Sequence, residues 1–520
     1  MKLQPLDIAI FFTYVVGLLV LALWISREEK GASKNTEDYF LASKALPWWA
    51  IGASLIASNI SAEQIIGMSG SGYAIGLAIA SYEWMAAITL IIVGKYMLPI
   101  FLKNEIFTMP QYLEQRFDSK VKTVLALFWL AVYVFVNLTA VLWLGGLAIE
   151  TVAGVDWMYG MIFLALFSVA YSLYGGLKAV AYTDILQVVL LVFGGLFLSY
   201  LALDAVADGD GIIAGFGVLT EQLPNHFDMI LSPDSPHYMS LPGLSVLIGG
   251  LWIMNISYWG FNQYIIQRAL AAKNLKEAQK GIAFAAYLKL LMPVIVVLPG
   301  IAAVVLYPQL TTPDQAYPSM MALMPTGIKG LIFAALVAAI VSSLASMTNS
   351  ISTIFTMDIY SKLKPGKSQK HYVFIGRSAA LISLAIALVV AEPLLGKFDQ
   401  AFQYIQEFTG FFTPGIVVIF VMGMFWSKAS SAGALAAAIG SAVFSILLKV
   451  YWVALPFMDR VGLVFLLCLA LCVIVSLAKP DKGQDSSVSL DDVNFKTSSN
   501  FNIAALGVVI ILIALYTTWW

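Results

Sequence analysis

The sequence has few charged residues, cysteines and histidines, and each shortage excludes a class of protein. Asp, Glu, Lys and Arg make up only 11% of the 520 residues, against about 25% in soluble domains, and the mean hydropathy is +0.86. So small a charged fraction cannot cover a water-facing surface. The two cysteines, Cys468 and Cys472, lie in one apolar stretch, which indicates packing rather than a redox or metal site. The sequence therefore predicts a protein that spans a membrane several times.

Known catalytic and nucleotide-binding motifs are missing as well. The three histidines all fall between apolar runs, and neither HExxH nor a serine-nucleophile elbow occurs. The stretch "SKLKPGKS" at 361–368 ends like a phosphate-binding loop, but Ser361 stands where the first glycine is required. With a net charge of −1, nucleic acid is not an expected partner. We therefore expect no enzyme and no nucleotide site, so that any uphill work would draw on an ion gradient.

The chain does contain fourteen apolar runs, each close to the ~20 residues that a helix needs to cross a bilayer. The first run lacks a small-residue cleavage site and is expected to be a retained helix rather than a signal peptide. The runs lie at roughly 6–26, 47–73, 75–100, 123–153, 156–173, 180–203, 242–266, 281–306, 327–359, 373–393, 399–425, 430–450, 460–478 and 501–518.

The loops between these runs alternate in charge. Most of the Lys and Arg residues fall in every second loop, whereas residues 204–241 contain six acidic residues and neither Lys nor Arg. By the positive-inside rule the base-rich loops are cytoplasmic. Both termini are therefore expected on the extracytoplasmic side.

Two apolar runs have an interrupted, polar character. They are "ASLIASNISAEQIIGMSGSGYAIG" at 53–76 and "GGLWIMNISYWGFNQYIIQR" at 249–268, and both contain the triplet Asn-Ile-Ser. Paired broken helices in two halves of a chain indicate a transporter site built from inverted repeats. The alternative is that both runs only pack small residues against neighbouring helices.

Isolated polar residues occur at membrane depth in other runs, where an acidic residue costs about 2.5–3.5 kcal/mol. Glu83 and Lys289 each demand a partner, and a purely structural ion pair between them is one explanation. The mixture of donors and acceptors suits a neutral solute with many hydroxyls, and Tyr258 and Trp259 could stack on a sugar ring. This mixture consists of Glu83, Lys289 and Gln406 together with Gln64 and Asn255 of the interrupted runs, and Glu407 is a further isolated polar residue beside Gln406.

A pair of serines in "AAIVSSLASMTNS" at 338–350 indicates a cation site. The hydroxyls of Ser342 and Ser343 can approach a carbonyl one turn back, near Ala339. Facing the opened backbone of the second run, they would offer uncharged oxygen ligands to an alkali cation. The alternative is that both hydroxyls bond back to their own helix.

At these residues the chain resembles the solute:sodium symporter family, and within it the bacterial sodium/galactose branch. The matching stretches include "NTEDYFLASKALPWWAIGASLIASNISAEQ", "SYEWMAAITLIIVGKY", "YGGLKAVAYTDILQ", "YWGFNQYIIQR", "AAIVSSLASM", "FQYIQEFTG" and "FNIAAL". The resemblance implies an all-α membrane protein of 14 transmembrane helices with a LeuT-type core of two inverted five-helix repeats. The parts would be an extra helix and cytoplasmic loop (1–46), the first repeat (47–203), an extracytoplasmic loop (204–241), the second repeat (242–425) and three C-terminal helices (426–520).

The resemblance also implies roles for single residues. Tyr258 would close the inner side by stacking on the sugar, with Asn59 holding its hydroxyl, and Asp184 would be a station on the sodium exit path. Ala86 and Ser257 depart from the wording of the sugar transporters, where Ser and Tyr are expected. The sugar would be bound by Gln64, Glu83, Asn255, Tyr258, Lys289 and Gln406; the outer gate would be Met68, Tyr82 and Phe402; and sodium would be held by the carbonyls of Ala57, Ile60 and Ala339 and the hydroxyls of Ser342 and Ser343.

The expected function is therefore sodium-coupled import of a hexose, galactose or glucose or both, across a bacterial inner membrane by alternating access. The expected partners are the hexose, the co-transported sodium ion and the lipid bilayer. One alternative is a different solute of the same family, such as proline, pantothenate or sialic acid. Another is a transporter-like sensor, although residues outside the apolar runs form no output domain.

Overall fold

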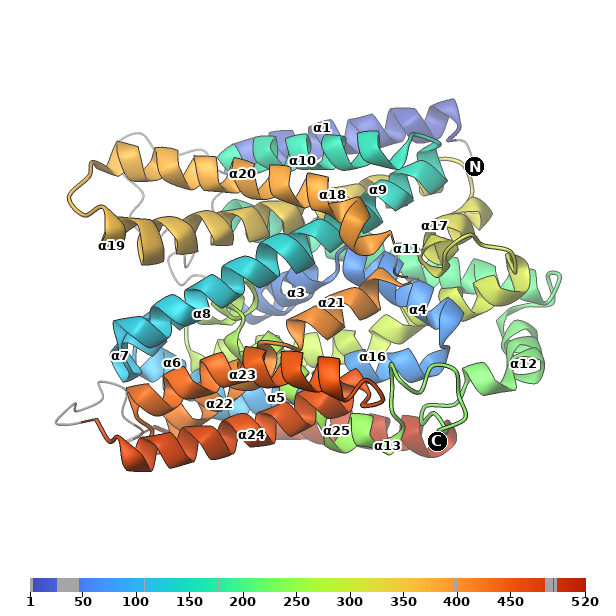
Figure 1. Cartoon of the computed structure of the whole chain (residues 1–520). Coiled ribbons are helices and arrows are strands. Elements are labelled where there is room, and N and C mark those ends of the chain that lie inside the picture. Colours follow the sequence, from blue (N-terminus) through green and yellow to red (C-terminus); the bar gives the residue numbers. More distant parts are fainter. Residues whose placement is uncertain are drawn as a thin grey trace.

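The computed structural model describes residues 3–25, 46–106, 108–174, 177–396, 398, 400–481, 490 and 493–520, with the backbone alone for 22, 23, 25 and 172–182. The described part of the chain is helical, and its only β pairing is an isolated bridge between Leu46 and Ala272. Figure 1 shows the helices running largely side by side as a bundle. The first base-rich loop (26–45) and the side chain of Lys178 lie outside the described residues.

Each of the fourteen apolar runs coincides with one helix or with an interrupted series of helices. Five series contain short π-helices. In chain order the elements are α1 (Pro5–Ile25); α3 (Trp48–Asn59), η2 (Glu63–Gly67) and α4 (Met68–Ala74); η3 (Leu77–Ala80), α5 (Ser81–Ile92), η4 (Val93–Met97) and α6 (Leu98–Lys103); α7 (Met109–Arg116); α8 (Ser119–Val132), η5 (Tyr133–Leu138) and α9 (Thr139–Ala153); α10 (Trp157–Tyr174); α11 (Leu177–Val206); α12 (Ile212–Gln222); η6 (Pro224–His226); α13 (Leu244–Ile248), α14 (Gly250–Ile256), η7 (Ser257–Phe261) and α15 (Gln263–Leu270); α16 (Leu275–Leu306); η8 (Pro313–Gln315), α17 (Ala316–Met320) and η9 (Met321–Leu323); α18 (Ile328–Thr353), η10 (Ile354–Tyr360) and α19 (Ser361–Leu363); α20 (Gln369–Leu395); α21 (Ala401–Thr409) and α22 (Thr413–Phe425); α23 (Ser431–Tyr451); α24 (Phe457–Ala478); and α25 (Ser499–Thr518).

Nine helices of the described residues are long and apolar enough to cross a membrane, or ten if the bent pair α21 and α22 is counted as one span. They differ in how deeply they are buried. In the most apolar stretch of Ile328–Leu363, 89% of the residues are buried inside the protein, whereas in Ser499–Thr518 the share is 11%. Since exposed Leu and Ile would be unfavourable in water, the peripheral helices present their apolar side chains to lipid, and α18 forms the centre of the bundle.

The two polar runs are interrupted, as their sequences predict. α3 ends at Asn59, and Ile60 has an extended backbone (φ −71°, ψ 91°) before η2 begins. In the second run, Asn262 is extended (φ −82°, ψ 120°) between η7 and α15. The Asn-Ile-Ser triplets do not mark equivalent points, because the first lies at its break and the second lies within the helix that precedes Asn262. The interruption, rather than the triplet, is the feature that the two runs share.

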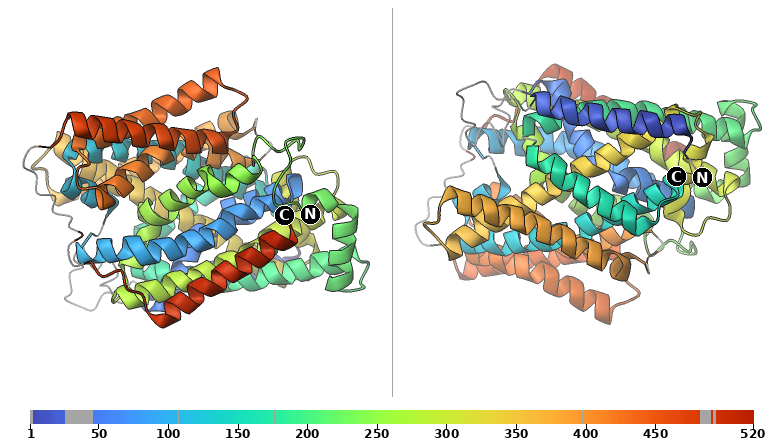
Figure 2. Two further views of the ribbon diagram at one scale, coloured as in Figure 1. Left: turned by 90° about the horizontal axis from the view of Figure 1, so that it is seen from below. Right: turned by 90° about the horizontal axis from the view of Figure 1, so that it is seen from above.

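Both chain ends lie at the same end of the bundle (Figures 1 and 2), which we call the terminal side. The opposite end carries α7 and α19 (Figure 1), and we call it the basic side because the described base-rich loops lie there. The N-terminal helix is fixed at the terminal side by Asp7, whose buried Oδ1 accepts hydrogen bonds from Gly327 N (2.6 Å) and Gly330 N (3.1 Å). Asp7 thus caps the first turn of α18 from a helix more than 300 residues away.

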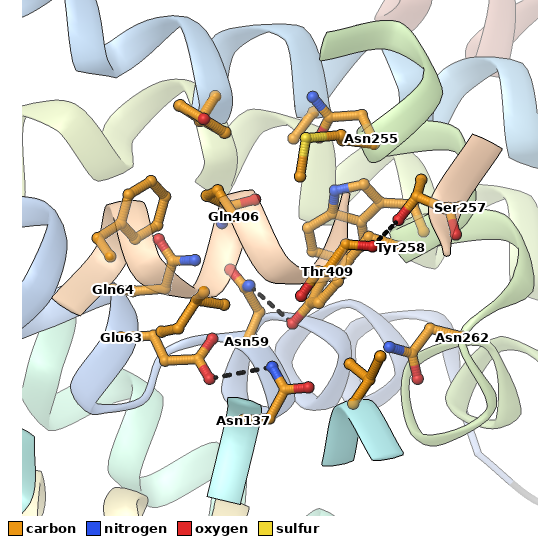
Figure 3. Close-up of a pocket in the computed structure, with 18 of the residues that line it drawn as sticks. Asn59, Glu63, Gln64, Asn137, Asn255, Ser257, Tyr258, Asn262, Gln406 and Thr409 are labelled. Carbon is orange, nitrogen blue, oxygen red and sulfur yellow. Dashed lines mark hydrogen bonds between the residues drawn. The ribbon is translucent and has the colours of Figure 1, made fainter. Parts of the chain in front are cut away.

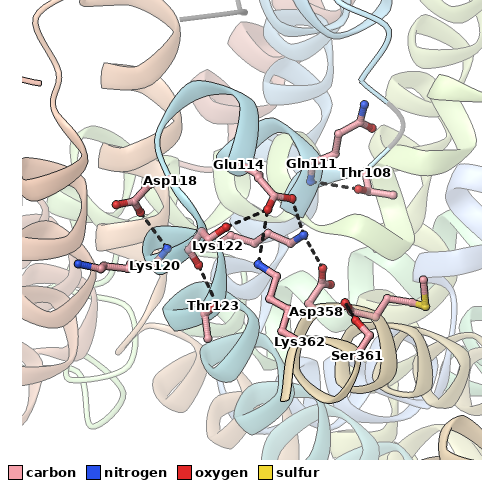
Figure 4. A network of polar contacts seen from close by, with 12 residues as sticks. Thr108, Gln111, Glu114, Asp118, Lys120, Lys122, Thr123, Asp358, Ser361 and Lys362 are labelled. Carbon is pink, nitrogen blue, oxygen red and sulfur yellow. Dashed lines mark hydrogen bonds and ion pairs between the residues drawn. The ribbon is translucent and has the colours of Figure 1, made fainter. Parts of the chain in front are cut away.

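A chain of alternating charges joins two segments at the basic side (Figure 4). Lys122 Nζ lies 2.7 Å from Glu114 Oε2 and 2.9 Å from Asp358 Oδ1, and Lys362 Nζ lies 3.4 Å from Glu114 Oε1. The hydrogen bond from Lys122 lowers the pKa of the Glu114 carboxyl. The network therefore holds the connecting helix α7 and the start of α8 against η10 and α19.

Candidate functional site

A polar cavity lies inside the bundle where the interrupted helices meet (Figure 3). Its empty space measures about 900 Å³, a figure that includes space open to solvent. The five hydrogen-bonding residues expected from the sequence all line it, and they come from five different segments. The lining residues of the central part are Asn59, Glu63, Gln64, Tyr82, Glu83, Ala86, Asn137, Asn255, Ser257, Tyr258, Trp259, Lys289, Phe402, Gln406 and Thr409.

Glu83 and Lys289 form an ion pair in the wall of this cavity. Lys289 Nζ lies 2.5 Å from Glu83 Oε2, and neither side chain is more than 3% exposed. Lys289 also donates to Asn59 Oδ1 and lies over the Trp259 ring, 5.0 Å from its centroid. The cavity wall is therefore locally neutral, although it contains both a carboxylate and an ammonium group.

A chain of hydrogen bonds leads from Lys289 to the tyrosine that was expected to close the inner side. Asn59, the last residue of α3, donates from Nδ2 to the Tyr258 hydroxyl at 3.0 Å (Figure 3). From the other direction the Tyr264 hydroxyl donates to the Tyr258 hydroxyl at 3.1 Å. Tyr264 is buried in α15. The hydroxyl of Tyr258 is thus held by both interrupted segments at once.

The cavity is closed toward the terminal side by aromatic residues. The rings of Tyr82 and Phe402 meet edge to face with centroids 5.0 Å apart, and Met68 is fully buried in α4. Toward the basic side the cavity continues past Tyr258 and is lined there by Trp129, Asn262, Thr413 and Ile416. Access from the terminal side would require the Tyr82–Phe402 contact to open.

Several polar atoms that line the cavity have no partner among the residues that the structure describes. The Oε1 atom of Gln64, the hydroxyl of Tyr82 and the hydroxyl of Thr409 are all buried and form no hydrogen bond there. A buried polar group without a partner costs roughly 1–3 kcal/mol. A solute with several hydroxyl groups would satisfy both donors and acceptors of this kind.

The serine pair lies at a second polar cluster, between α18, α11 and α15. Ser342 Oγ donates to Asp184 Oδ1 at 2.7 Å, and Arg268 Nη2 lies 3.8 Å from Asp184 Oδ2. The Ser343 hydroxyl is buried and has no partner in the described part of the chain. Neither serine bonds back to its own helix, and α18 runs unbroken through Ala339. The carbonyl of Ala339 is therefore not opened by a break in its own helix, and the interrupted backbone in this region belongs to α3 at Ile60.

The structure places two acidic residues, Glu407 and Glu63, differently from what the sequence predicted. Glu407 does not face the solute as a lone group: its Oε1 atom lies 2.7 Å from Lys449 and 3.1 Å from Arg460. Glu63, which sequence reasoning left out, lines the cavity with its carboxylate 3.4 Å from Asn137 Nδ2 (Figure 3). Its position next to Gln64 in the polar run was the signal that could have identified it. The partners of Glu407 come from α23 and α24, and no local pattern points to them.

A helical membrane bundle that encloses a polar cavity between interrupted helices has the architecture of a secondary transporter. Comparison with solved structures finds the same fold in other proteins. A sodium-coupled sialic acid symporter superposes with a TM-score of 0.78 over 92% of this chain and 100% of that one, at 22% identity. The nucleobase-cation symporter Mhp1 in a closed conformation superposes with a TM-score of 0.53 over 89% of this chain and 100% of its own, at 13% identity. At these identities the likeness concerns the fold.

Comparison with known sequences identifies the family. The model of the "Sodium:solute symporter family" matches residues 39–440, and the chain belongs to this family. It is 52% identical to the sodium/glucose cotransporter of Vibrio parahaemolyticus, over 100% of this chain and 99% of that protein. The human sodium/myo-inositol cotransporter 2 is 33% identical over 83% of this chain and 68% of its own length. The zebrafish sodium/glucose cotransporter 4 is 34% identical over 83% of this chain and 70% of its own length.

Proposed function

We propose that the protein imports a neutral hexose, glucose or galactose, together with sodium by alternating access. The observation that carries this proposal is the polar cavity between the interrupted helices, whose Lys289 is paired with Glu83 and in which buried oxygens of Gln64, Tyr82 and Thr409 have no partner among the described residues. The 52% identity to a sodium/glucose cotransporter over the whole chain supports the solute class.

The charges of the cavity favour an uncharged solute. Lys289 is already neutralised by Glu83, so a carboxylate such as sialic acid, proline or pantothenate would meet no free cation there. A hexose hydroxyl could accept from Lys289 and donate to Glu83 without changing the charge of the site. Tyr258 and Trp259 place aromatic surface beside these groups, where it can pack on the apolar face of a sugar ring.

The sodium ion would be held between α3 and α18. The residues there fit an alkali cation, because the Ser343 hydroxyl is buried with no partner among the described residues and α3 ends in extended backbone at Ile60, which frees carbonyl groups. The carbonyls of Ala57, Ile60 and Ala339 and the hydroxyls of Ser342 and Ser343 are the proposed ligands. Asp184, bonded to Ser342, would receive the ion on its way out. If sodium binds in only one position of α3 relative to α18, its binding shifts the equilibrium between the open and the closed cavity, and this couples sodium to transport.

The proposed topology has fourteen membrane segments, with inverted repeats at 47–203 and 242–425. It is supported by the fourteen helices or interrupted series that match the apolar runs and by the position of both termini at one end of the bundle. The base-rich side would be cytoplasmic by the positive-inside rule, so the terminal side would face outward from a bacterial inner membrane. In this orientation the closed contact of Tyr82 and Phe402 is the outer gate.

The ion gradient supplies enough free energy for this function. One positive charge that moves through ~100 mV releases about 2.3 kcal/mol. At about 1.4 kcal/mol per tenfold concentration ratio, the membrane potential alone would support roughly 50-fold accumulation of the solute. The sodium concentration gradient would add to this ratio.

Uptake into proteoliposomes tests the proposal. Labelled glucose and galactose should accumulate when sodium is present outside, and the accumulation should disappear when choline replaces sodium. Competition by unlabelled glucose, galactose, myo-inositol, proline, pantothenate and sialic acid then identifies the solute class. Sodium-independent accumulation would overturn the coupling, and competition by the organic acids or proline alone would overturn the assignment to a hexose.

A further inference from the structure

Asp314 is a buried carboxylate at the terminal side that the transport cavity does not use. It belongs to η8, in the loop between α16 and α18, and only 3% of its surface is exposed. Its Oδ2 atom accepts a hydrogen bond from Ala401 N at 2.9 Å, while its Oδ1 atom has no partner among the residues described. The loop is itself fixed, because Gln315 Oε1 accepts from the backbone N–H of Thr311 at 3.2 Å. A carboxylate half-satisfied in this way is unusual in a folded protein.

The contacts of Asp314 connect two of the elements that close the cavity. Ala401 is the first residue of α21 and directly precedes Phe402. On the other side Asp314 packs against Gly70 of α4, where a Cβ atom would collide with its Oδ1 atom and backbone. α4 begins at Met68, and Phe402 in turn packs on Gly67, at the preceding turn. A shift that separates Tyr82 from Phe402 and moves α4 or α21 away from the loop must therefore break or strain the contacts of Asp314.

No charged side chain of the described residues is bonded to Asp314. In the described residues its carboxylate forms no ion pair, and its one hydrogen bond is to Ala401 N. Burial raises its pKa to about 7, an effect only partly offset by the Ala401 N–H. The titratable residues of the elements packed against η8 or bonded to Asp314 are Glu63 in η2, Tyr73 in α4, Glu150 in α9, Tyr317 in α17, and Tyr404 and Glu407 in α21.

We propose that Asp314 is a positioning residue of the outer gate: it holds the first turn of α21 against α4 while the cavity is closed toward the terminal side, and proton uptake at its carboxyl favours the closed state. The orientation of this gate rests on the proposed function. The sign follows from linkage. A carboxyl that becomes solvated when the gate opens returns toward its ordinary pKa near 4, so the closed state binds more protons, and a lower external pH shifts the protein toward closure.

The accessibility of a cysteine in α4 measures this equilibrium directly. Ser71 is fully buried in α4, and Ser71→Cys adds a near-isosteric thiol to a parent in which Cys468 and Cys472 are replaced by alanine. The rate of labelling by a membrane-impermeant maleimide, on purified protein of the full chain, reports the opening of the terminal side. Asp314→Asn keeps an acceptor for Ala401 N but cannot titrate. Because the thiol introduced by Ser71→Cys titrates in the same way in both proteins, its own pH dependence drops out of the ratio of their labelling rates at each pH.

The expected ratio of the labelling rates, parent to Asp314→Asn, rises about tenfold from pH 6 to pH 8, as a carboxyl pKa of about 7 in the closed state and near 4 in the open state requires. Asp314→Ala, which removes the acceptor, should label several-fold faster than the parent at pH 6. As a matched control, Asp204 accepts from Gly211 N at 3.1 Å in a different loop, and Asp204→Asn should leave both rates unchanged.

A constant ratio of parent to Asp314→Asn from pH 6 to pH 8 would overturn the proton uptake. Unchanged labelling in Asp314→Ala at both pH values would overturn the positioning role. If Asp314→Ala does not fold, as judged by size-exclusion chromatography, the labelling rates of the parent and Asp314→Asn at the two pH values test the proposal by themselves. The assay requires neither sodium nor sugar, so a failure of the proposed function, seen as absent uptake in the parent, is distinguished from a failure of this inference.

Discussion

Lys289 Nζ and Glu83 Oε2 lie 2.5 Å apart in the wall of the cavity, each fully or almost fully buried. The pair explains why two ionisable residues are found in apolar helices, because each one cancels the desolvated charge of the other. It also connects α5 and α16 beside the proposed sugar site.

Replacing one partner of the pair should be worse for stability than replacing both. Lys289→Met or Glu83→Gln leaves one buried charge uncompensated, which costs about 3–5 kcal/mol, and should lower the midpoint of thermal unfolding. The double variant should regain most of that stability. Sugar uptake should stay below one hundredth of the parent rate in all three variants. Recovery of uptake in the double variant would show that the pair has only a structural role and does not bind the sugar.

Ser343→Ala should weaken the sodium dependence of uptake without unfolding the protein. Within the described residues the hydroxyl has no partner, so its loss removes a proposed ligand but no hydrogen bond to them. We expect the sodium concentration for half-maximal uptake to rise at least about tenfold, which corresponds to ~1.4 kcal/mol. Ser350→Ala in the same helix is the matched control, since that hydroxyl bonds to Ser346 O at 3.0 Å. An unchanged sodium dependence in Ser343→Ala would remove this residue from the ion site.

Tyr264→Phe should loosen the inner closure of the cavity. The substitution keeps the buried ring and removes one of two hydrogen bonds to the Tyr258 hydroxyl, worth about 0.5–1.5 kcal/mol. Bound labelled sugar should therefore dissociate roughly two- to tenfold faster in a rapid-dilution assay. Tyr112→Phe serves as the control, because the Tyr112 hydroxyl is buried without a partner in α7. Equal dissociation rates in the two variants would contradict the role of Tyr264.

Lys122→Met should destabilise the basic side of the bundle. The change leaves Asp358, which is 8% exposed, and Glu114 without their shared cation (Figure 4). A loss of roughly 2–3 kcal/mol is expected, less than for a fully buried pair because Glu114 is partly exposed. Lys362→Met removes only a solvent-accessible partner at 3.4 Å and should have little effect. Thermal unfolding in detergent compares the two variants, and equal midpoints would show that the network does not hold these segments together.

The sequence by itself determined the membrane class, the apolar helices and the polar residues of the cavity. Hydropathy identified the helices because a bilayer forces the backbone to satisfy its own hydrogen bonds within each crossing segment. Glu83 and Lys289 stood out because ionisable residues at membrane depth are too costly to occur without a partner. The two interrupted runs were visible for the same reason, since polar residues and glycines collected where the helices open at Ile60 and Asn262.

Only the tertiary structure decided which of these groups meet. Glu407 binds Lys449 and Arg460 from helices outside the expected repeats, and Asp314 reaches the backbone of Ala401, 87 residues further along the chain. Ser342 bonds to Asp184 on α11 rather than to its own helix. The spacing of residues within one run shows which face of a helix is polar. It does not show which helix packs against that face, because this depends on how helices far apart in the chain pack together.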